Sequence, residues 1–307
     1  MTQPRCILKG ATYLVTRRCV DRQFLLTPQG RSAEIFGYCL AKSIKEHGLL
    51  LHGVMTMPNH YHSVITDPRG VIDEQCRDAN SLSARSLNAH HDRWESMWSS
   101  QGLSLVRLDG PEDVMEKLVY LALNPVKAGL VDRPADWPGL RTLPSHALHR
   151  PRILRRPQTR FFANSHLPEE VELEVTVPPQ FAHLGPEEFV RQLQERVQEE
   201  VEALRAERQK QGKSVMGARA VQRQPRHGKP KTPAQRRQRD PAIACKNTKR
   251  RIELLREQKT FRTRYQDCRK RKVAGENNVL FPAGTLLLAR QGWVICERAP
   301  PWEHQAA

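Results

Sequence analysis

The sequence predicts an α+β fold in which helices cover one face of an antiparallel sheet. Two observations predict it: short apolar, β-branched segments alternate with segments of helical periodicity, and two of the apolar segments follow each other across a tight turn. Over residues 1–140 the predicted order is strand, helix, strand, strand, helix, strand, helix. This order matches a split β-α-β layout of the ferredoxin type, which leaves the other face of the sheet free for a ligand.

The first predicted elements have clear local signals. Residues 11–20 (ATYLVTRRCV) begin with apolar and β-branched residues, which favours a strand. Residues 32–48 carry apolar side chains at helical spacing and end on Gly48, a typical helix stop. The stretches LLLHGVMTM and HYHSVIT then predict two strands joined at Pro58-Asn59, a turn dipeptide.

The remaining elements of this region follow in the same way. Residues 71–92 predict a helix with a thin apolar face, and LSLVRL (103–108) predicts a short strand. Residues 109–113 (DGPED) combine a polar cap candidate, a first-turn proline and carboxylates near the positive end of the helix dipole. They predict the start of a helix that continues through VMEKLVYLAL and carries Tyr120.

The composition changes beyond about residue 140. The predicted segments there are a proline-rich connector (141–185), an amphipathic helix (186–218), a basic and mobile linker (219–241), and a basic helix followed by a small β-like unit (242–307). We therefore expect a basic C-terminal extension that is partly helical and partly disordered.

Positive charge dominates the composition and lies almost entirely in one segment. The chain has 50 Lys and Arg against 33 Asp and Glu, a net charge of +17, and residues 205–272 have 24 against 5. Such an excess points to nucleic acid or, less well, to an anionic membrane. Because the sequence has neither an apolar run long enough for a spanning helix nor the pattern of a signal peptide, we expect a cytoplasmic protein with no membrane partner.

The stretch MTMPNHYHSVITDP (55–68) places His60 and His62 two residues apart. Residues i and i+2 of a strand share a face, so both imidazoles could converge on one metal ion. Taken alone, such a pair is more often two ordinary strand histidines, one against the core and one hydrogen-bonded. A metal site would also need a third ligand and an open position.

Tyr120 and Asn124, in YLALNPVKAGL, are the second pair of candidates. A tyrosine in an apolar helix usually belongs to the core. Pro125 disfavours helical geometry at Asn124, so we expect Asn124 to cap a new short turn that Gly129 closes. In the functional alternative, Asn124 contacts a metal or phosphate about one turn from Tyr120, since residues i and i+4 share a helical face.

Two motifs together resemble a known family. MPNHYH and, later in the chain, YLALNPVKAGLV resemble the paired signature of the single-tyrosine HUH transposases, in particular the REP-associated tyrosine transposases. YLVTRRCVDRQFLL is similar to the opening strand and turn of that family. The similarity extends over residues 10–140, and residues 76–102 follow the family pattern only loosely.

The resemblance implies a role for each candidate residue. His60 and His62 would bind a divalent metal ion, Mg²⁺ or Mn²⁺, Tyr120 would be the nucleophile, and Asn124 would complete the metal site. Residues 1–140 would then be a HUH tyrosine transposase catalytic domain. Single-stranded or hairpin DNA would be its partner, the protein would be a monomer or a homodimer, and its setting would be the bacterial nucleoid.

The basic segment is either a solvated tail or a clamp on the DNA backbone. We favour the clamp because so much charge lies next to a nuclease-like domain. The candidate DNA-contacting residues are Arg17, Arg18, Lys127, Arg236, Arg237, Lys249, Arg250 and Arg251.

The leading hypothesis is a metal-dependent transposase and endonuclease that cleaves and rejoins single-stranded DNA beside hairpin elements through a 5′-phosphotyrosine. A phenol has an ordinary pKa of about 10, so its attack at neutral pH needs help from the metal. Two alternatives stay open. One is a domesticated, non-catalytic protein that binds hairpin DNA or RNA, and the other is a hydrolytic metal nuclease in which Tyr120 belongs to the core.

Overall fold

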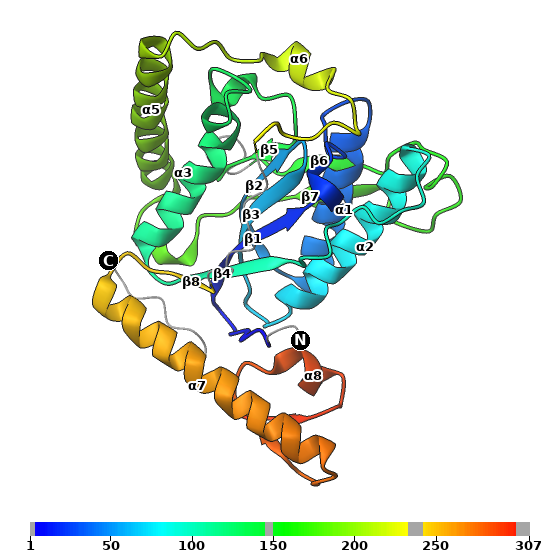
Figure 1. Ribbon diagram of the computed structural model, residues 1–307, viewed down its shortest axis with the longest axis vertical. Helices are drawn as coiled ribbons and strands as arrows, with labels where there is room; N and C mark the ends of the chain where they lie inside the picture. The colour runs from blue at the N-terminus through cyan, green and yellow to red at the C-terminus, as the bar shows by residue number, and fades with distance from the viewer. Residues whose placement is uncertain (1–3, 145–149, 233–241, 299–307) are drawn as a thin grey trace.

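A six-stranded sheet lies at the centre of the structure, a computed structural model that describes residues 4–144, 150–232 and 242–298 (Figure 1). The strands lie in the order β5-β2-β3-β1-β4-β8. They are β1 (Thr12–Arg18), β2 (Leu50–Met57), β3 (His60–Thr66), β4 (Ser104–Leu108), β5 (Arg141–Thr142) and β8 (Ile243–Ala244).

The first four strands form the layout that the sequence predicts. β1 lies between β3 and β4 and is antiparallel to both, while β2 and β3 form a hairpin across Pro58 and Asn59. The order β2-β3-β1-β4 is that of a split β-α-β fold. The α+β class and the antiparallel arrangement are therefore confirmed. β5 and β8 extend the two edges of the sheet, and β8 runs parallel to β4.

Helices cover both faces of this sheet rather than one (Figure 1). α1 (Ser32–His47) and α2 (Ile72–His90) pack together on the face to which Tyr13 projects. α3 (Pro111–Lys127) packs on the opposite face, and α5 (Pro186–Lys210) packs against α3. The expectation of a free second face is wrong, because α3 is amphipathic and its apolar stripe is buried against β2 and β3.

Local signals set two helix boundaries as predicted. Gly48 follows α1 with a φ of 64°, a left-handed conformation that glycine adopts without steric cost. α3 begins at Pro111, and the Asp113 carboxylate accepts a hydrogen bond of 3.0 Å from the backbone N–H of Gly110. Carboxylates in this first turn also favour the positive end of the helix dipole.

The chain beyond β5 adds elements around this core. They are β6 (Arg152–Arg155), β7 (Glu170–Leu173), α6 (Ala218–Gln222), α7 (Thr248–Val273), β9 (Leu280–Phe281), α8 (Leu286–Arg290) and β10 (Ile295–Cys296). Elsewhere in the chain, short 3-10 turns occur at Val20–Arg22, Pro134–Asp136 and Pro179–Phe181. β6 and β7 pair in antiparallel orientation next to α1. β9 and β10 pair in parallel, with α8 between them in the chain.

α7 is long and strongly basic, and it runs along the edge of the molecule below the sheet (Figure 1). It contains 11 Lys and Arg against 3 Asp and Glu. Its buried side chains, Leu254, Phe261 and Cys268, recur every seven residues and so form one narrow stripe. Most of the helix surface is exposed.

The predicted linker 219–241 is described only in part. Arg236 and Arg237 lie outside the described residues. Residues 219–232 include most of α6 and contact the N-terminal region, where the backbone N–H of Phe24 donates to the carbonyl of Gly228 at 3.0 Å. None of the helices within residues 4–144, 150–232 and 242–298 combines the length and apolar character that crossing a membrane requires.

Candidate active site

His60 and His62 lie at the start of β3, on the face of the sheet that α3 covers. Their ring centroids are 4.7 Å apart. In the register of β1 and β3, Thr16 lies opposite His62 and Arg18 lies opposite His60, so these four side chains share a face. The two imidazoles are thus neighbours, next to an exposed arginine.

Each imidazole has a hydrogen-bond partner at Nδ1. His60 Nδ1 lies 2.7 Å from Asn59 Oδ1, and His62 Nδ1 lies 2.7 Å from Thr16 Oγ1. A carbonyl oxygen can only accept, so His60 Nδ1 donates and its Nε2 keeps a free lone pair. With the same tautomer, His62 Nδ1–H donates to Thr16. Oxygen acceptors at Nδ1 are the usual way to orient a histidine that binds a metal through Nε2.

Both histidines are held in the neutral form. Burial lowers the pKa of His60 to about 4, and Arg18 acts in the same direction. Burial also places the pKa of His62 well below its ordinary value, helped by His60 and Arg18. A neutral imidazole is the form that binds a metal ion, so both side chains are ready to act as ligands without losing a proton.

Tyr120 reaches the histidines from α3. Its hydroxyl lies 3.3 Å from His62 Nε2, and the two ring centroids are 5.2 Å apart in an edge-to-face arrangement. Burial raises the pKa of Tyr120, and the neighbouring Asn124 side chain partly opposes this effect. The phenol is therefore protonated at neutral pH, and it donates towards His62 Nε2.

The sequence predicts that α3 ends at Asn124. This prediction is wrong, because α3 continues through Pro125 to Lys127. The proline removes one backbone hydrogen bond, yet Asn124, Pro125 and Val126 are all buried, and this packing offsets the loss. Asn124 therefore stays on the helical face of Tyr120, one turn further on. Gly129 follows the helix with a φ of 66°.

Asn124 is a buried polar residue with unused hydrogen-bonding capacity. Its side chain is close enough to Tyr120 to lower the pKa of the phenol, but Nδ2 has no hydrogen bond of normal geometry. The residue is only 9% exposed. A buried amide nitrogen without a partner is costly, so its position beside a cluster of polar side chains favours a functional role.

The donor set at this site is two imidazoles and one amide. In the described parts of the chain, no three His, Cys, Asp or Glu side chains are grouped so that they could hold a metal ion. A metal at this face would therefore rely on His60, His62 and the Asn124 amide oxygen. Three protein ligands leave coordination positions for substrate oxygens, which suits a catalytic site.

The candidate DNA-contacting residues lie in different surroundings. Arg18 is exposed beside His60, whereas Arg17 projects to the opposite face of the sheet and is half-buried near Tyr61. Lys127 forms an ion pair of 3.2 Å with Glu200 on α5. Of the two β1 arginines, Arg18 is therefore the one that shares the face of the histidines.

The α7 candidates also differ from one another. Arg250 is engaged with acidic groups, among them the buried Asp109 at 3.5 Å and Glu253 at 3.2 Å. Lys249 and Arg251 are exposed, and neither forms an ion pair with any described residue. These two side chains are available to an external anion.

Two residues that orient the histidines were not identified from the sequence. Asn59 was assigned only to the turn, although it directly precedes His60. Thr16 lies far from the histidines in sequence, and the register of β1 against β3 is what brings it to His62. Only the correct register of β1 against β3 could have identified Thr16 as a partner of His62.

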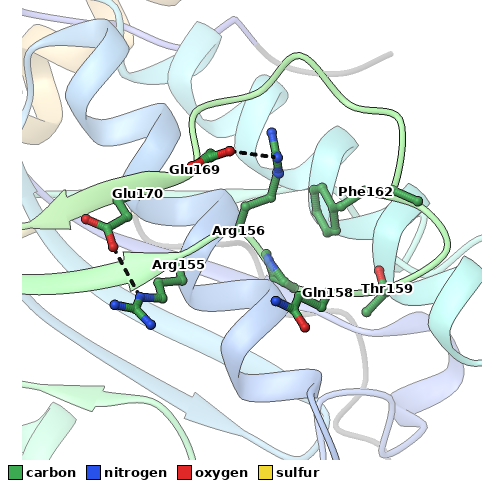
Figure 2. Close-up of a pocket in the computed structure, with 9 residues that line it drawn as sticks. Arg155, Arg156, Gln158, Thr159, Phe162, Glu169 and Glu170 are labelled. Carbon is green, nitrogen blue, oxygen red and sulfur yellow. Dashed lines mark hydrogen bonds and ion pairs between the residues drawn. The ribbon is translucent and has the colours of Figure 1, made fainter.

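A separate pocket of about 600 Å³ lies between β6 and β7 and the loop that joins them (Figure 2). Its arginines are paired: Arg155 with Glu170 at 3.1 Å and Arg156 with Glu169 at 3.7 Å. None of the candidate catalytic side chains lines it. The charges of this pocket are balanced within the chain, which gives it no preference for an anion.

Comparisons with known proteins find similarity among solved structures. No family model and no curated protein matches the chain. A REP-associated tyrosine transposase bound to a REP hairpin is similar over 49% of this chain and 84% of its own, with 20% sequence identity and a TM-score of 0.41. A Deinococcus radiodurans R1 protein, provisionally described as a transposase, is similar over 34% of this chain and 85% of its own, with 18% identity and a TM-score of 0.28.

Proposed function

We propose that this protein is a metal-dependent, single-tyrosine transposase that cleaves and rejoins single-stranded DNA beside hairpin elements. Tyr120 is the nucleophile, and His60, His62 and Asn124 are the metal ligands. The observation that carries the proposal is the approach of the Tyr120 hydroxyl to 3.3 Å from His62 Nε2. A side chain of α3 and a histidine pair on β3, far apart in sequence, thereby meet at one point.

The reaction is a transesterification at one phosphodiester. The Tyr120 oxygen forms a bond to phosphorus, the bond from phosphorus to the 3′ oxygen breaks, and the net proton transfer is from the phenol to the departing 3′ oxygen. The product is a 5′-phosphotyrosine and a free 3′-hydroxyl. Attack by a different 3′-hydroxyl reverses the step and joins two strands without ATP.

Because the pKa of Tyr120 is raised, the phenol keeps its proton at neutral pH, and its attack on the phosphate needs assistance from the site. A divalent ion, Mg²⁺ or Mn²⁺, would polarise the scissile phosphate and stabilise charge on the leaving oxygen. The chain itself orients the groups: Asn59 and Thr16 fix the two imidazoles, and α3 fixes the phenol beside them. Such fixed geometry lowers the entropic cost of the attack.

The C-terminal extension would supply affinity for DNA. Lys249 and Arg251 are exposed on α7, a helix with a large excess of positive charge. Contacts from such side chains to phosphates release counterions and carry no sequence information. We therefore assign α7 to the DNA backbone and the chemistry to the site on β3 and α3.

The direct test is a covalent adduct with DNA. The purified protein is incubated with labelled single-stranded DNA carrying a hairpin, in Mg²⁺ or Mn²⁺, and the products are separated under denaturing conditions. We expect a protein-DNA adduct from the wild-type chain and from Tyr265→Phe, a matched change on α7, and none from Tyr120→Phe. An adduct that persists in Tyr120→Phe would remove Tyr120 from the role of nucleophile.

The same assay separates the alternatives. Cleavage without an adduct, with free 5′-phosphate or 5′-hydroxyl ends, would indicate a hydrolytic nuclease. Binding of hairpin DNA or RNA with no cleavage in either metal would indicate a non-catalytic binding protein.

A further inference from the structure

Trp94 is an exposed aromatic side chain in the loop that follows α2. It is 91% exposed, more than any other large apolar side chain that the structure describes. An indole in this position offers a flat apolar surface that no neighbouring group covers. Single exposed apolar side chains are common on protein surfaces, so the role of Trp94 depends on the groups that surround it.

The loop that carries Trp94 is fixed on both sides of the indole. The backbone N–H of Arg93 donates to the carbonyl of Asn88 at 2.9 Å, and the Asn88 side-chain amide donates to the carbonyl of Glu95 at 2.6 Å. Further along, Trp98 is buried against Tyr61 and donates from Nε1 to the carbonyl of Asn80 at 2.8 Å. The indole is thus presented on an ordered backbone, which reduces the entropic cost of binding.

This loop leads directly to the candidate active site. Cys19 and Trp98 form an antiparallel bridge, and the backbone N–H of Ser99 donates to the carbonyl of Arg18 at 2.9 Å. Arg18 in turn lies opposite His60 across β1 and β3. A strand bound at the histidines therefore passes close to the segment that holds Trp94.

Positive charge flanks the same loop. Residues 219–232, here called the basic strap, contain five Lys and Arg and no Asp or Glu. The strap is fastened at Phe24 and Arg22, which donate to the carbonyls of Gly228 at 3.0 Å and Thr232 at 2.7 Å. Within the strap, Arg226 lies near the end of α2, where it contributes to the lowered pKa values of His90 and His91.

Arg93, next to Trp94, has a largely buried guanidinium, so it holds the loop rather than facing solvent. Its Nη1 donates to the Gln23 side chain at 3.2 Å, while Nε and Nη2 have no hydrogen-bond partner. Arg93 Nη2 forms an ion pair of 3.9 Å with Glu95. An exposed aromatic plane beside a basic strap is the combination with which proteins hold single strands, where bases stack and phosphates are neutralised.

We propose that Trp94 stacks on an unpaired base of the bound DNA strand while the basic strap contacts its phosphates. This inference rests on the proposed single-stranded DNA substrate, because a base within a duplex does not expose its face to an indole. The contact adds affinity without sequence preference, since every base has an aromatic face. It also holds the strand next to the histidines.

The test compares Trp94→Ala with two control variants. Trp94→Phe keeps an aromatic plane, and Trp293→Ala removes another exposed tryptophan, 71% exposed, from the C-terminal unit. Affinity is measured for the full chain without divalent metal, so that no cleavage occurs. The ligands are a hairpin with an unpaired extension and the same hairpin with an abasic extension.

We expect Trp94→Ala to weaken binding of the unpaired extension by about 5- to 150-fold, as for the loss of one stacked base. Trp94→Phe should lose less, and Trp293→Ala should bind as the wild type does. On the abasic extension, Trp94→Ala and the wild type should bind equally. Equal affinity of Trp94→Ala and wild type for the unpaired extension, or an equal loss on both ligands, would overturn the proposal.

The outcome is separable from that of the proposed function. A covalent adduct on Tyr120 together with unchanged binding by Trp94→Ala would reject the stacking site alone. Binding that depends on Trp94 without any adduct would reject the transposase activity alone. A wild-type chain that binds neither ligand would reject both.

Discussion

Two regions of the molecule carry the candidate functional side chains: the central sheet with α3, and the C-terminal helix α7. They differ in how far these side chains are buried and hydrogen-bonded. On the sheet, His62 is 6% exposed and is fixed by Thr16 and Tyr120. On α7, Lys249 and Arg251 are exposed and have no acidic partner in the described part of the chain. Buried, oriented groups suit chemistry, and exposed charges suit contact with a phosphate backbone. The two proposed functions should therefore respond to different substitutions.

Removal of either histidine should give the largest separation between reaction and binding. We expect His60→Ala or His62→Ala to lower the rate of DNA cleavage by about 1000-fold or more, because a metal ion contributes several kcal/mol to such a step. Binding of the same DNA without metal should be nearly unchanged. Cleavage rates and affinities measured in parallel check this, with His183→Ala, an exposed histidine, as the control. Equal losses in all three variants would contradict it.

A smaller effect, on metal binding, should follow from Thr16→Val. The valine is nearly isosteric but cannot accept the hydrogen bond from His62 Nδ1, so the imidazole loses its fixed tautomer and orientation. We expect Mn²⁺ affinity, measured by calorimetric titration, to fall by about 10- to 100-fold. Thr16→Ser keeps the hydroxyl and should restore most of the affinity. Identical Mn²⁺ binding by both variants would show that Thr16 does not orient His62.

The smallest effect should come from α7 and should fall on binding alone. With Lys249 and Arg251 both changed to alanine, we expect affinity to drop several-fold and the salt dependence of binding to weaken, by about 0.7 to 0.9 in slope for each lost phosphate contact. Arg191→Ala on α5 is the control, because Glu188 at 2.7 Å already engages this arginine. The cleavage rate at saturating DNA should not change. A salt dependence equal to that of the wild type would show that the DNA does not contact Lys249 or Arg251.

Much of the fold over residues 1–140 follows from local signals in the sequence. Alternation and turn residues identified β1 to β4, and Gly48 and Pro111 marked helix ends where the structure has them. No local signal predicts the helices on the second face of the sheet, because they depend on the long-range packing of α3 and α5. Pro125 predicts a helix end at Asn124, which is wrong, because the burial of Asn124, Pro125 and Val126 keeps this turn helical.

The candidate site was predictable only in its parts. Spacing alone placed His60 and His62 on one face, and the periodicity of α3 could place Asn124 one turn beyond Tyr120. The meeting of Tyr120 with His62 depends on how α3 crosses the sheet, which no local pattern contains. Thr16 and Trp94 depend on strand register and on loop hydrogen bonds, respectively.

The central claim is that Tyr120 forms the covalent bond to DNA. Mass spectrometry of the protease-digested reaction mixture, with the wild-type chain and Mn²⁺, would locate the nucleotide on one peptide. We predict a 5′-linked nucleotide on the hydroxyl of Tyr120 and a free 3′-hydroxyl on the released strand. A nucleotide found on another residue, or cleaved DNA with no modified peptide, would contradict the account.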